Sequence, residues 1–187
     1  MAPRFFALYD TVEFPHRWQL DDPVDSEGRE MDDWLFKSGT PVSGVGPFHI
    51  SIDQAGRPLD FSETHLGVPI VHVRVASLFT ELAAHDVQFI PAGIEGYSDQ
   101  YLILVATRRI ACIDEKASRI RLWTHEDGVP HKVGQYKSVR SLRVDPSKVG
   151  GARVFRLAGW EGVLVVSEEL KGALEGIGAT GTRFEEV

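Results

Sequence analysis

The chain has 187 residues, of which 43% are hydrophobic and 25% are charged, and its formal net charge at pH 7 is −7. These values are typical of a globular domain of ordinary size and exclude disordered and membrane-spanning compositions. Cys112 is the only cysteine, so no intramolecular disulfide forms, and its apolar surroundings predict a buried, unreactive thiol.

The N-terminal stretch, residues 1–60, is rich in Pro, Gly, Asp and Trp, and it has only short apolar runs. This composition predicts loops and short strands rather than a packed layer. The opening stretch MAPRFFALYDTVEF lacks the sustained apolar run of a secretory signal, and runs such as YLILVA are much shorter than a membrane span. We therefore expect a cytoplasmic protein that does not interact with membranes.

The next part of the chain has the periodicity of regular secondary structure. VPIVHVRV predicts a strand, ASLFTELAAHD predicts a helix with Leu78, Phe79 and Leu82 at helical spacing, and QYLILVATRRIACID predicts one long buried strand. RIRLW alternates charged and bulky residues, so it predicts a half-exposed strand with Ile120 and Leu122 on one face.

The C-terminal part of the chain gives the clearest prediction. ARVFRLAGWEGVLVVS is typical of a hairpin that turns at AGWEG. Ser167 is placed to cap a helix whose first turn carries Glu168 and Glu169, and Gly178 is placed to end it in a left-handed conformation. The apolar face of this helix comprises Leu170, Ala173, Leu174 and Ile177. TRFEEV then returns as a short strand.

Together these elements predict an α+β fold with a mostly antiparallel or mixed sheet, a few short helices and a loop-rich N-terminal segment. We expect residues 1–187 to form a single domain. Within it, residues 1–60 can form a loop-rich lobe and residues 61–187 the main α+β core.

Charge is distributed unevenly along the chain. The net charges of residues 1–60, 61–105, 106–160 and 161–187 are −6, −4, +7 and −4. We interpret the basic stretch as complementing the acidic ones within the fold. A nucleic-acid site is disfavoured, because the basic residues are spread through predicted strands and the whole protein is acidic.

No catalytic or cofactor-binding motif is found in the sequence. GIGATG, from Gly176 to Gly181, matches the dinucleotide fingerprint GxGxxG, but here it follows a predicted helix, whereas the fingerprint follows a strand and opens a helix. We interpret it as a helix stop and a turn. The neighbouring carboxylates Asp114 and Glu115 point to opposite faces of a strand, so they do not form an acid–base pair. We therefore predict no catalytic residues and no cofactor.

Three histidines, His49, His65 and His72, fall close together in the sequence, but their spacing matches no metal-ligand motif. We interpret them as ordinary strand and loop residues and predict no metal site. The alternative is an enzyme of unrecognised type, in which these histidines and Asp53 or Asp60 form a pocket.

The most unusual segment is QLDDPVDSEGREMDDWLF, residues 19–36, in which seven acidic residues accompany a single basic one. Acidic side chains beside large aromatic ones can steer and then anchor a basic partner. The candidate partner-binding residues are Asp21, Asp22, Asp25, Asp32, Asp33 and Trp34. The alternative is a solvated loop whose tryptophans pack in the core.

Several stretches resemble a known family, most clearly LVVSEELKGALEGIGATGTRFEEV, and also GRPLDFS, CIDEKASRIRLW and DPSKVGGARVFR. They look like the bacterial polymorphic-toxin immunity protein family eleven, formerly a domain of unknown function. The resemblance runs over most of the chain and is weakest in the acidic segment. It implies a protein that binds and neutralises a cognate toxin, encoded by an adjacent gene, by stoichiometric occlusion. The resemblance implies no catalytic residues and does not identify the toxin. An adaptor that binds a non-toxin protein remains an alternative.

Overall fold

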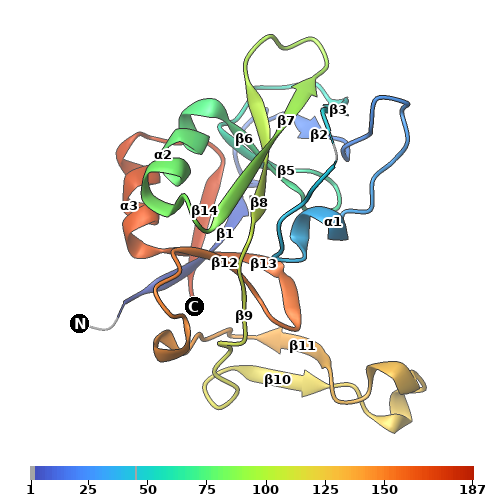
Figure 1. The fold of residues 1–187 in the computed structure, drawn as a ribbon, viewed down its shortest axis with the longest axis vertical. Coiled ribbons are helices and arrows are strands. Elements are labelled where there is room, and N and C mark those ends of the chain that lie inside the picture. Colours follow the sequence, from blue (N-terminus) through green and yellow to red (C-terminus); the bar gives the residue numbers. More distant parts are fainter. Residues whose placement is uncertain (1–2, 45) are drawn as a thin grey trace.

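The computed structural model describes residues 3–44 and 46–187, and two five-stranded sheets form its centre (Figure 1). The first sheet has the spatial order β14 (Thr182–Glu186), β1 (Phe5–Asp10), β13 (Trp160–Ser167), β12 (Val154–Leu157) and β9 (Arg109–Ile110). The second has the order β3 (Phe48–Ile50), β7 (Val87–Ile94), β8 (Tyr101–Ala106), β6 (Pro69–His72) and β5 (Phe61–Glu63). Parallel pairing occurs in β9–β12 and β3–β7, and the other strand pairs of these sheets are antiparallel.

Short elements complete the fold. Two-stranded ladders are formed by β2 (Gln19–Leu20) with β4 (Ile52–Gln54) and by β10 (Arg119–Leu122) with β11 (Tyr136–Arg140). The α-helices are α1 (Trp34–Lys37), α2 (Val73–Ala83) and α3 (Glu168–Gly176), and the 3₁₀ turns are η1 (His125–Asp127), η2 (Pro130–Lys132) and η3 (Pro146–Lys148). The predicted α+β class with mixed sheets is therefore confirmed. Within the described ranges, no helix has both the length and the apolar character that a bilayer crossing requires.

Three apolar clusters hold these layers together. The first lies between the two sheets and includes the buried faces of α2 and α3. The second covers the outer face of the second sheet with the N-terminal segment, including Trp18 and Phe36. The third covers the outer face of the first sheet with residues 112–152, including Cys112. The fold thus has a two-sheet centre with an irregular covering on each side.

The expectation that residues 1–60 form no packed layer is wrong for β1. This strand lies inside the first sheet, with β13 on one side and β14 on the other. Phe5, Phe6, Ala7 and Leu8 are all buried. The opening residues Met1 and Ala2 lie outside the described ranges. Composition could not reveal this strand, because both of its partners lie at the other end of the chain.

The predicted strand VPIVHVRV is also wrong in its second half. β6 ends at His72, and α2 begins at Val73. The imidazole of His72 accepts a hydrogen bond from the backbone N–H of Arg74 at 3.3 Å, which caps the helix. Val75, Phe79 and Ala83 repeat every four residues and are buried, so helical packing overrides the strand preference of the β-branched residues.

The single long strand predicted from QYLILVATRRIACID is two strands in different sheets. β8 ends at Ala106, the backbone N–H of Thr107 bonds to the Asp86 carbonyl, and β9 joins the first sheet. No glycine or proline marks this crossing in the sequence, so local patterns did not indicate it.

The C-terminal prediction is confirmed. β12 and β13 form the hairpin, and the Ser167 hydroxyl accepts a hydrogen bond from the Leu170 backbone N–H at 3.3 Å to cap α3. Leu170 and Leu174 are fully buried, and Gly178 has the expected positive φ of 61°. Ile177 differs from the prediction: it lies just beyond the helix and is 36% exposed.

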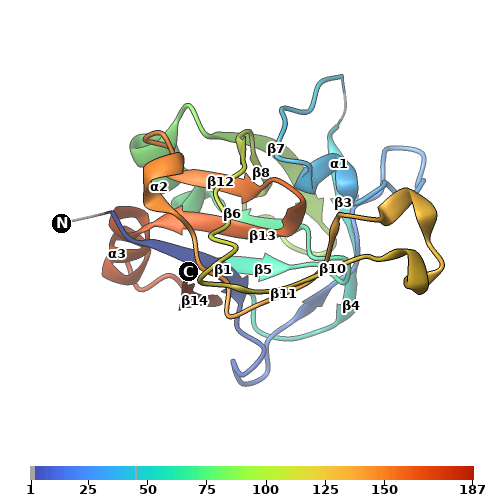
Figure 2. The ribbon, with the colours of Figure 1, turned by 90° about the horizontal axis from the view of Figure 1, so that it is seen from below.

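The β10–β11 hairpin and the turns η1 and η2 form an arm, residues 119–140, that extends from the body beside the first sheet (Figures 1 and 2). Ile120 is partly buried against the body, but Leu122 is 43% exposed. The pairing register shifts between Arg121 and Leu122. Such a shift ends the strict alternation of faces, so Leu122 does not share the buried face of Ile120 as predicted.

Candidate functional site

The two tryptophans of the acidic segment have different environments. Trp18 is fully buried, and its indole N–H donates a hydrogen bond to the Ser62 hydroxyl at 2.9 Å. Trp34 opens α1 and is 48% exposed. A solvated loop with its tryptophans in the core therefore describes Trp18 but not Trp34.

Three of the candidate aspartates hold the segment's own structure. Asp22 accepts hydrogen bonds from the Thr64 hydroxyl at 2.5 Å and the Leu66 backbone N–H at 3.0 Å. Asp25 organises a turn by accepting from the backbone N–H of Arg29, which holds the pKa of its carboxyl below the usual range. Asp33 forms an ion pair with Lys37 one helical turn later. These carboxylates are largely committed to internal bonds.

Other carboxylates of the segment face solvent. Glu27, Glu30 and Asp32 are exposed, and the side chain of Asp21 is 47% exposed. Asp32 also accepts a hydrogen bond from the Trp34 backbone N–H at 3.0 Å. The surface available to a partner therefore consists of Asp21, Glu27, Glu30, Asp32 and the Trp34 ring, which overlaps only in part with the predicted set.

The three histidines have separate roles. His72 caps α2 and packs against the ring of Tyr101. His49 lies in β3 and its backbone bonds to Val24. His65 lies in the loop after β5, between Asp21 and Asp53 at 3.5 and 3.4 Å. The pocket that the enzyme alternative requires is therefore not formed by these histidines together.

His65, Asp21 and Asp53 do bring three potential ligand atoms within 4.8 Å of one another. Asp53 and His65 are exposed, and Asp21 is intermediate. The close Asp and His pairing by itself is a surface ion pair when the imidazole is protonated. The absence of a bound metal stays a prediction.

A groove separates α1 from the arm. It has a volume of about 470 Å³ and combines two aromatic, one aliphatic and two acidic side chains from four parts of the chain. Its lining residues are Trp34, Glu115, Leu122, Gly134, Gln135, Tyr136, Gly159 and Glu161. Except for Trp34, sequence reasoning missed this set, because only the fold brings the arm, the β12–β13 turn and α1 together.

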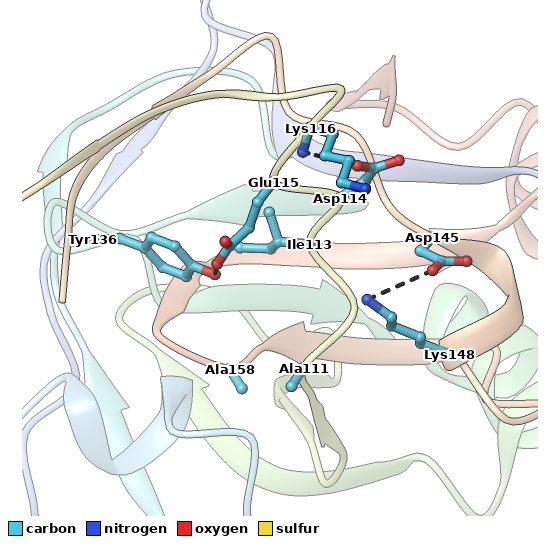
Figure 3. A pocket seen from close by; sticks show the side chains of 9 residues that line it. All are labelled: Ala111, Ile113, Asp114, Glu115, Lys116, Tyr136, Asp145, Lys148 and Ala158. Carbon is cyan, nitrogen blue, oxygen red and sulfur yellow. Dashed lines mark hydrogen bonds and ion pairs between the residues drawn. The ribbon is translucent and has the colours of Figure 1, made fainter. Parts of the chain in front are cut away.

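A second hollow, of about 530 Å³, lies beneath the base of the arm (Figure 3). Glu115 and Tyr136 line both hollows, and the Tyr136 hydroxyl donates a hydrogen bond to the Glu115 carboxylate at 2.6 Å. Burial and this bond raise the pKa of Tyr136 to about 12, so the hydroxyl stays a donor at neutral pH. Lys148 and Asp145 pair at 3.6 Å across from it. The lining of this hollow contains no histidine or cysteine, and the Asp114 carboxylate accepts hydrogen bonds from the backbone N–H groups of Lys116 and Ala117.

Comparison with known families identifies the chain. The model of the immunity protein family (Imm11) matches residues 14–187, almost the whole sequence. The chain belongs to the Imm11 immunity protein family. No curated protein sequence matches it. The family match confirms the resemblance drawn from the C-terminal stretch and includes the whole acidic segment, where that resemblance was weakest.

In this Imm11 protein, the basic stretch, residues 106–160, pairs with only some of the acidic residues of the rest of the chain. Arg108 pairs with Asp86 at 3.6 Å and Arg153 pairs with Glu169 at 3.2 Å, so the basic stretch contacts its acidic neighbours. Within residues 3–44 and 46–187, no ion pair joins it to the acidic N-terminal stretch that precedes β5. The exposed carboxylates of the acidic segment therefore receive no counter-charge from the basic stretch.

Four charged side chains, Asp10, Arg17, Glu63 and Arg156, are partly or fully buried. Glu63 accepts a hydrogen bond from the Asp10 backbone N–H at 3.2 Å, and Asp10 pairs with Arg17 at 2.7 Å. Arg156 is fully buried, and its Nε and Nη2 have no hydrogen-bond partner among the described residues. Burial lowers the pKa of Arg156 to about 10 and raises the pKa of Glu63 to about 6.

Glu63 should make the Imm11 protein less stable as pH rises. Its pKa is about 6 when folded against an ordinary value of 4.5, so the folded state holds the proton more tightly. The stabilisation that protonated Glu63 contributes to the folded state is fully present below pH 4.5 and is lost as the pH rises through about 6. Relative to Glu63→Gln, the wild-type free energy of unfolding should fall by about 1–2 kcal/mol between pH 4 and pH 7. Urea denaturation of both proteins across this range measures the difference, and parallel pH profiles would contradict it.

Proposed function

We propose that this Imm11 protein neutralises a cognate bacterial toxin by binding it stoichiometrically and occluding it in the cytoplasm of the producing cell. The observation that carries the proposal is the family match over residues 14–187. The protein acts as a binder and not as an enzyme in this proposal, which is supported by the separate roles of His49, His65 and His72.

The acidic segment supports a direct contact with the toxin. Asp21, Glu27, Glu30 and Asp32 give a solvent-facing cluster of carboxylates, and Trp34 stands exposed at its end. A toxin domain that acts on nucleic acid needs a basic cleft to hold phosphates, and an acidic surface can occupy that cleft in place of them. The exposed indole then adds an aromatic anchor, a frequent source of interface energy.

Co-purification with the toxin domain encoded by the adjacent gene tests this proposal. We expect a one-to-one complex that survives size-exclusion chromatography and abolishes the toxin's activity in proportion to the amount bound. If the purified proteins elute separately and the toxin stays active at equal concentrations, the proposed function is wrong.

The contribution of the acidic segment requires a variant that leaves its structure intact. Asp22, Asp25 and Asp33 are kept, because they hold local bonds, and Asp32→Asn retains the oxygen that accepts from the Trp34 backbone N–H. Changing Asp21 and Asp32 to Asn, and Glu27 and Glu30 to Gln, removes four charges from the exposed carboxylates. The association rate should fall about tenfold or more at low salt, and its salt dependence should weaken, because long-range steering is lost. Stopped-flow fluorescence at several salt concentrations measures both effects.

A matched control removes the same charge elsewhere. Glu81, Glu169, Glu175 and Glu185 are exposed on α2, α3 and β14, across the molecule from α1 (Figure 1). Changing these four to Gln should leave the association rate within about threefold of wild type, since steering depends on where the charge lies. Equal slowing by both variants would show that net charge, and not the acidic segment, steers the toxin.

A further inference from the structure

The groove between α1 and the arm presents apolar surface that no other part of the described chain covers. Five large hydrophobic residues are exposed among the described residues, and two of them, Trp34 and Leu122, line this groove. They come from opposite walls, one from the body and one from the arm. Exposed apolar side chains gathered in one concave site are typical of interaction surfaces.

The same groove is acidic. Glu115 and Glu161 are its only charged lining residues, and no Lys, Arg or His lines it. Each carboxylate is held in place through one oxygen: Glu115 Oε1 accepts from Tyr136, and Glu161 Oε1 accepts from the Gly159 backbone N–H at 3.0 Å. Among the described residues, no hydrogen-bond donor or ion-pair partner contacts the second oxygen of either carboxylate.

The side chain of Glu161 is only 11% exposed, and its nearest cation, Arg109, lies at 3.7 Å. Arg109 pairs with Oε1 at the long end of the ion-pair range, so the second oxygen of this largely buried carboxylate is left for a closer positive partner. The position of this carboxylate is set by the β12–β13 turn, because Gly159 both donates to it and has a positive φ of 83°. The groove thus holds this carboxylate in position and leaves one of its oxygens open to a cation.

We propose that this groove receives an arginine side chain from the toxin, which stacks on Trp34 and pairs with Glu161 while neighbouring apolar atoms pack on Leu122. A guanidinium suits both Trp34 and Glu161, because it is planar and can stack on an indole, and its paired donors match a carboxylate. This inference rests on the proposed toxin binding and names the kind of segment that is bound. It extends the interface from the acidic segment across to the arm.

Three substitutions test the groove without disturbing the fold. Trp34→Ala and Leu122→Ala truncate exposed side chains, and Glu161→Gln keeps the oxygen that accepts from Gly159. Each should raise the Kd for the toxin domain of the adjacent gene at least about tenfold, mainly through faster dissociation, because these contacts form after encounter. Ile177→Ala is the control, and it should change the Kd less than twofold. Ile177 is 36% exposed and directly follows α3, which lies on the other side of the molecule from α1 (Figure 1).

A blocking experiment gives a second readout. Leu122→Cys introduces an accessible thiol, whereas burial raises the pKa of the native Cys112 thiol to about 11 and leaves it unreactive. A bulky maleimide attached at position 122 should fill the groove and prevent complex formation. The same label on Ile177→Cys should leave binding intact. On the toxin side, replacing the bound arginine with alanine should weaken wild-type binding but cause little further loss when Glu161 is already Gln.

The outcomes separate this inference from the proposed function. Loss of affinity in the groove variants, with the Ile177 controls unaffected, supports the inference. If the wild-type complex forms but the three groove variants and the labelled protein bind within twofold of wild type, the groove inference is wrong and toxin binding stands. If the wild-type protein forms no complex, both are overturned.

Discussion

Replacing Gly181 with alanine should destabilise the protein by about 3–6 kcal/mol, one of the largest effects of any single substitution in this chain. Gly181 has a φ of 91°, in the region that side chains rarely adopt. A Cβ at this position would lie 2.0 Å from the backbone carbonyl oxygen of Phe61 and 3.1 Å from the Leu59 Cβ. The Phe61 carbonyl cannot shift away from the added Cβ without disturbing the second sheet, because Phe61 is paired with Val71 there.

Two neighbouring glycines provide controls for this prediction. Gly178 has a φ of 61°, but a Cβ there would meet open space, so Gly178→Ala should cost only about 1 kcal/mol of backbone strain. Gly176, the last residue of α3, has neither a positive φ nor an atom close to the added Cβ, so Gly176→Ala should be neutral or slightly stabilising. Urea denaturation of the three variants measures the series. If Gly181→Ala lost no more stability than Gly178→Ala, the close approach of residue 181 to β5 would be wrong.

Leu174→Ala should reduce the free energy of unfolding by about 2–5 kcal/mol, the usual range for a fully buried leucine. Leu174 is 0% exposed and belongs to the cluster between the sheets, where α3 packs beside α2. Truncation removes apolar contacts and leaves a cavity that the two rigid sheets cannot close.

The matched control for Leu174 is Leu66, a leucine that is 52% exposed in the loop before β6. Leu66→Ala should cost less than about 0.5 kcal/mol, because little apolar area leaves or enters water. Chemical denaturation with an unchanged m-value gives both numbers. A loss below about 1 kcal/mol for Leu174→Ala would show that α3 does not dock on the core.

The elements that could be predicted from the sequence are those whose contacts are local. The β12–β13 hairpin, the Ser167 cap and the Gly178 stop all depend on residues a few positions apart, so their patterns were sufficient. The strand β1 was missed for the opposite reason, since its neighbours β13 and β14 come from the far end of the chain. The split between β8 and β9 was missed because a change of sheet at Thr107 leaves the apolar pattern unbroken.

The same distinction applies to the candidate site. The accumulation of acidic residues beside Trp34 was evident from the sequence alone, and the family could be recognised from the C-terminal stretch. Which carboxylates are free was decided only by tertiary contacts, as when Asp22 bonds to the loop before β6 while Asp32 remains exposed. The groove was decided in the same way, because Trp34, Leu122 and Glu161 come together only once the two coverings pack on the two sheets. Sequence composition determines how much charge and aromatic surface a segment carries, whereas burial and hydrogen bonding between distant segments decide how much of it is left for a partner.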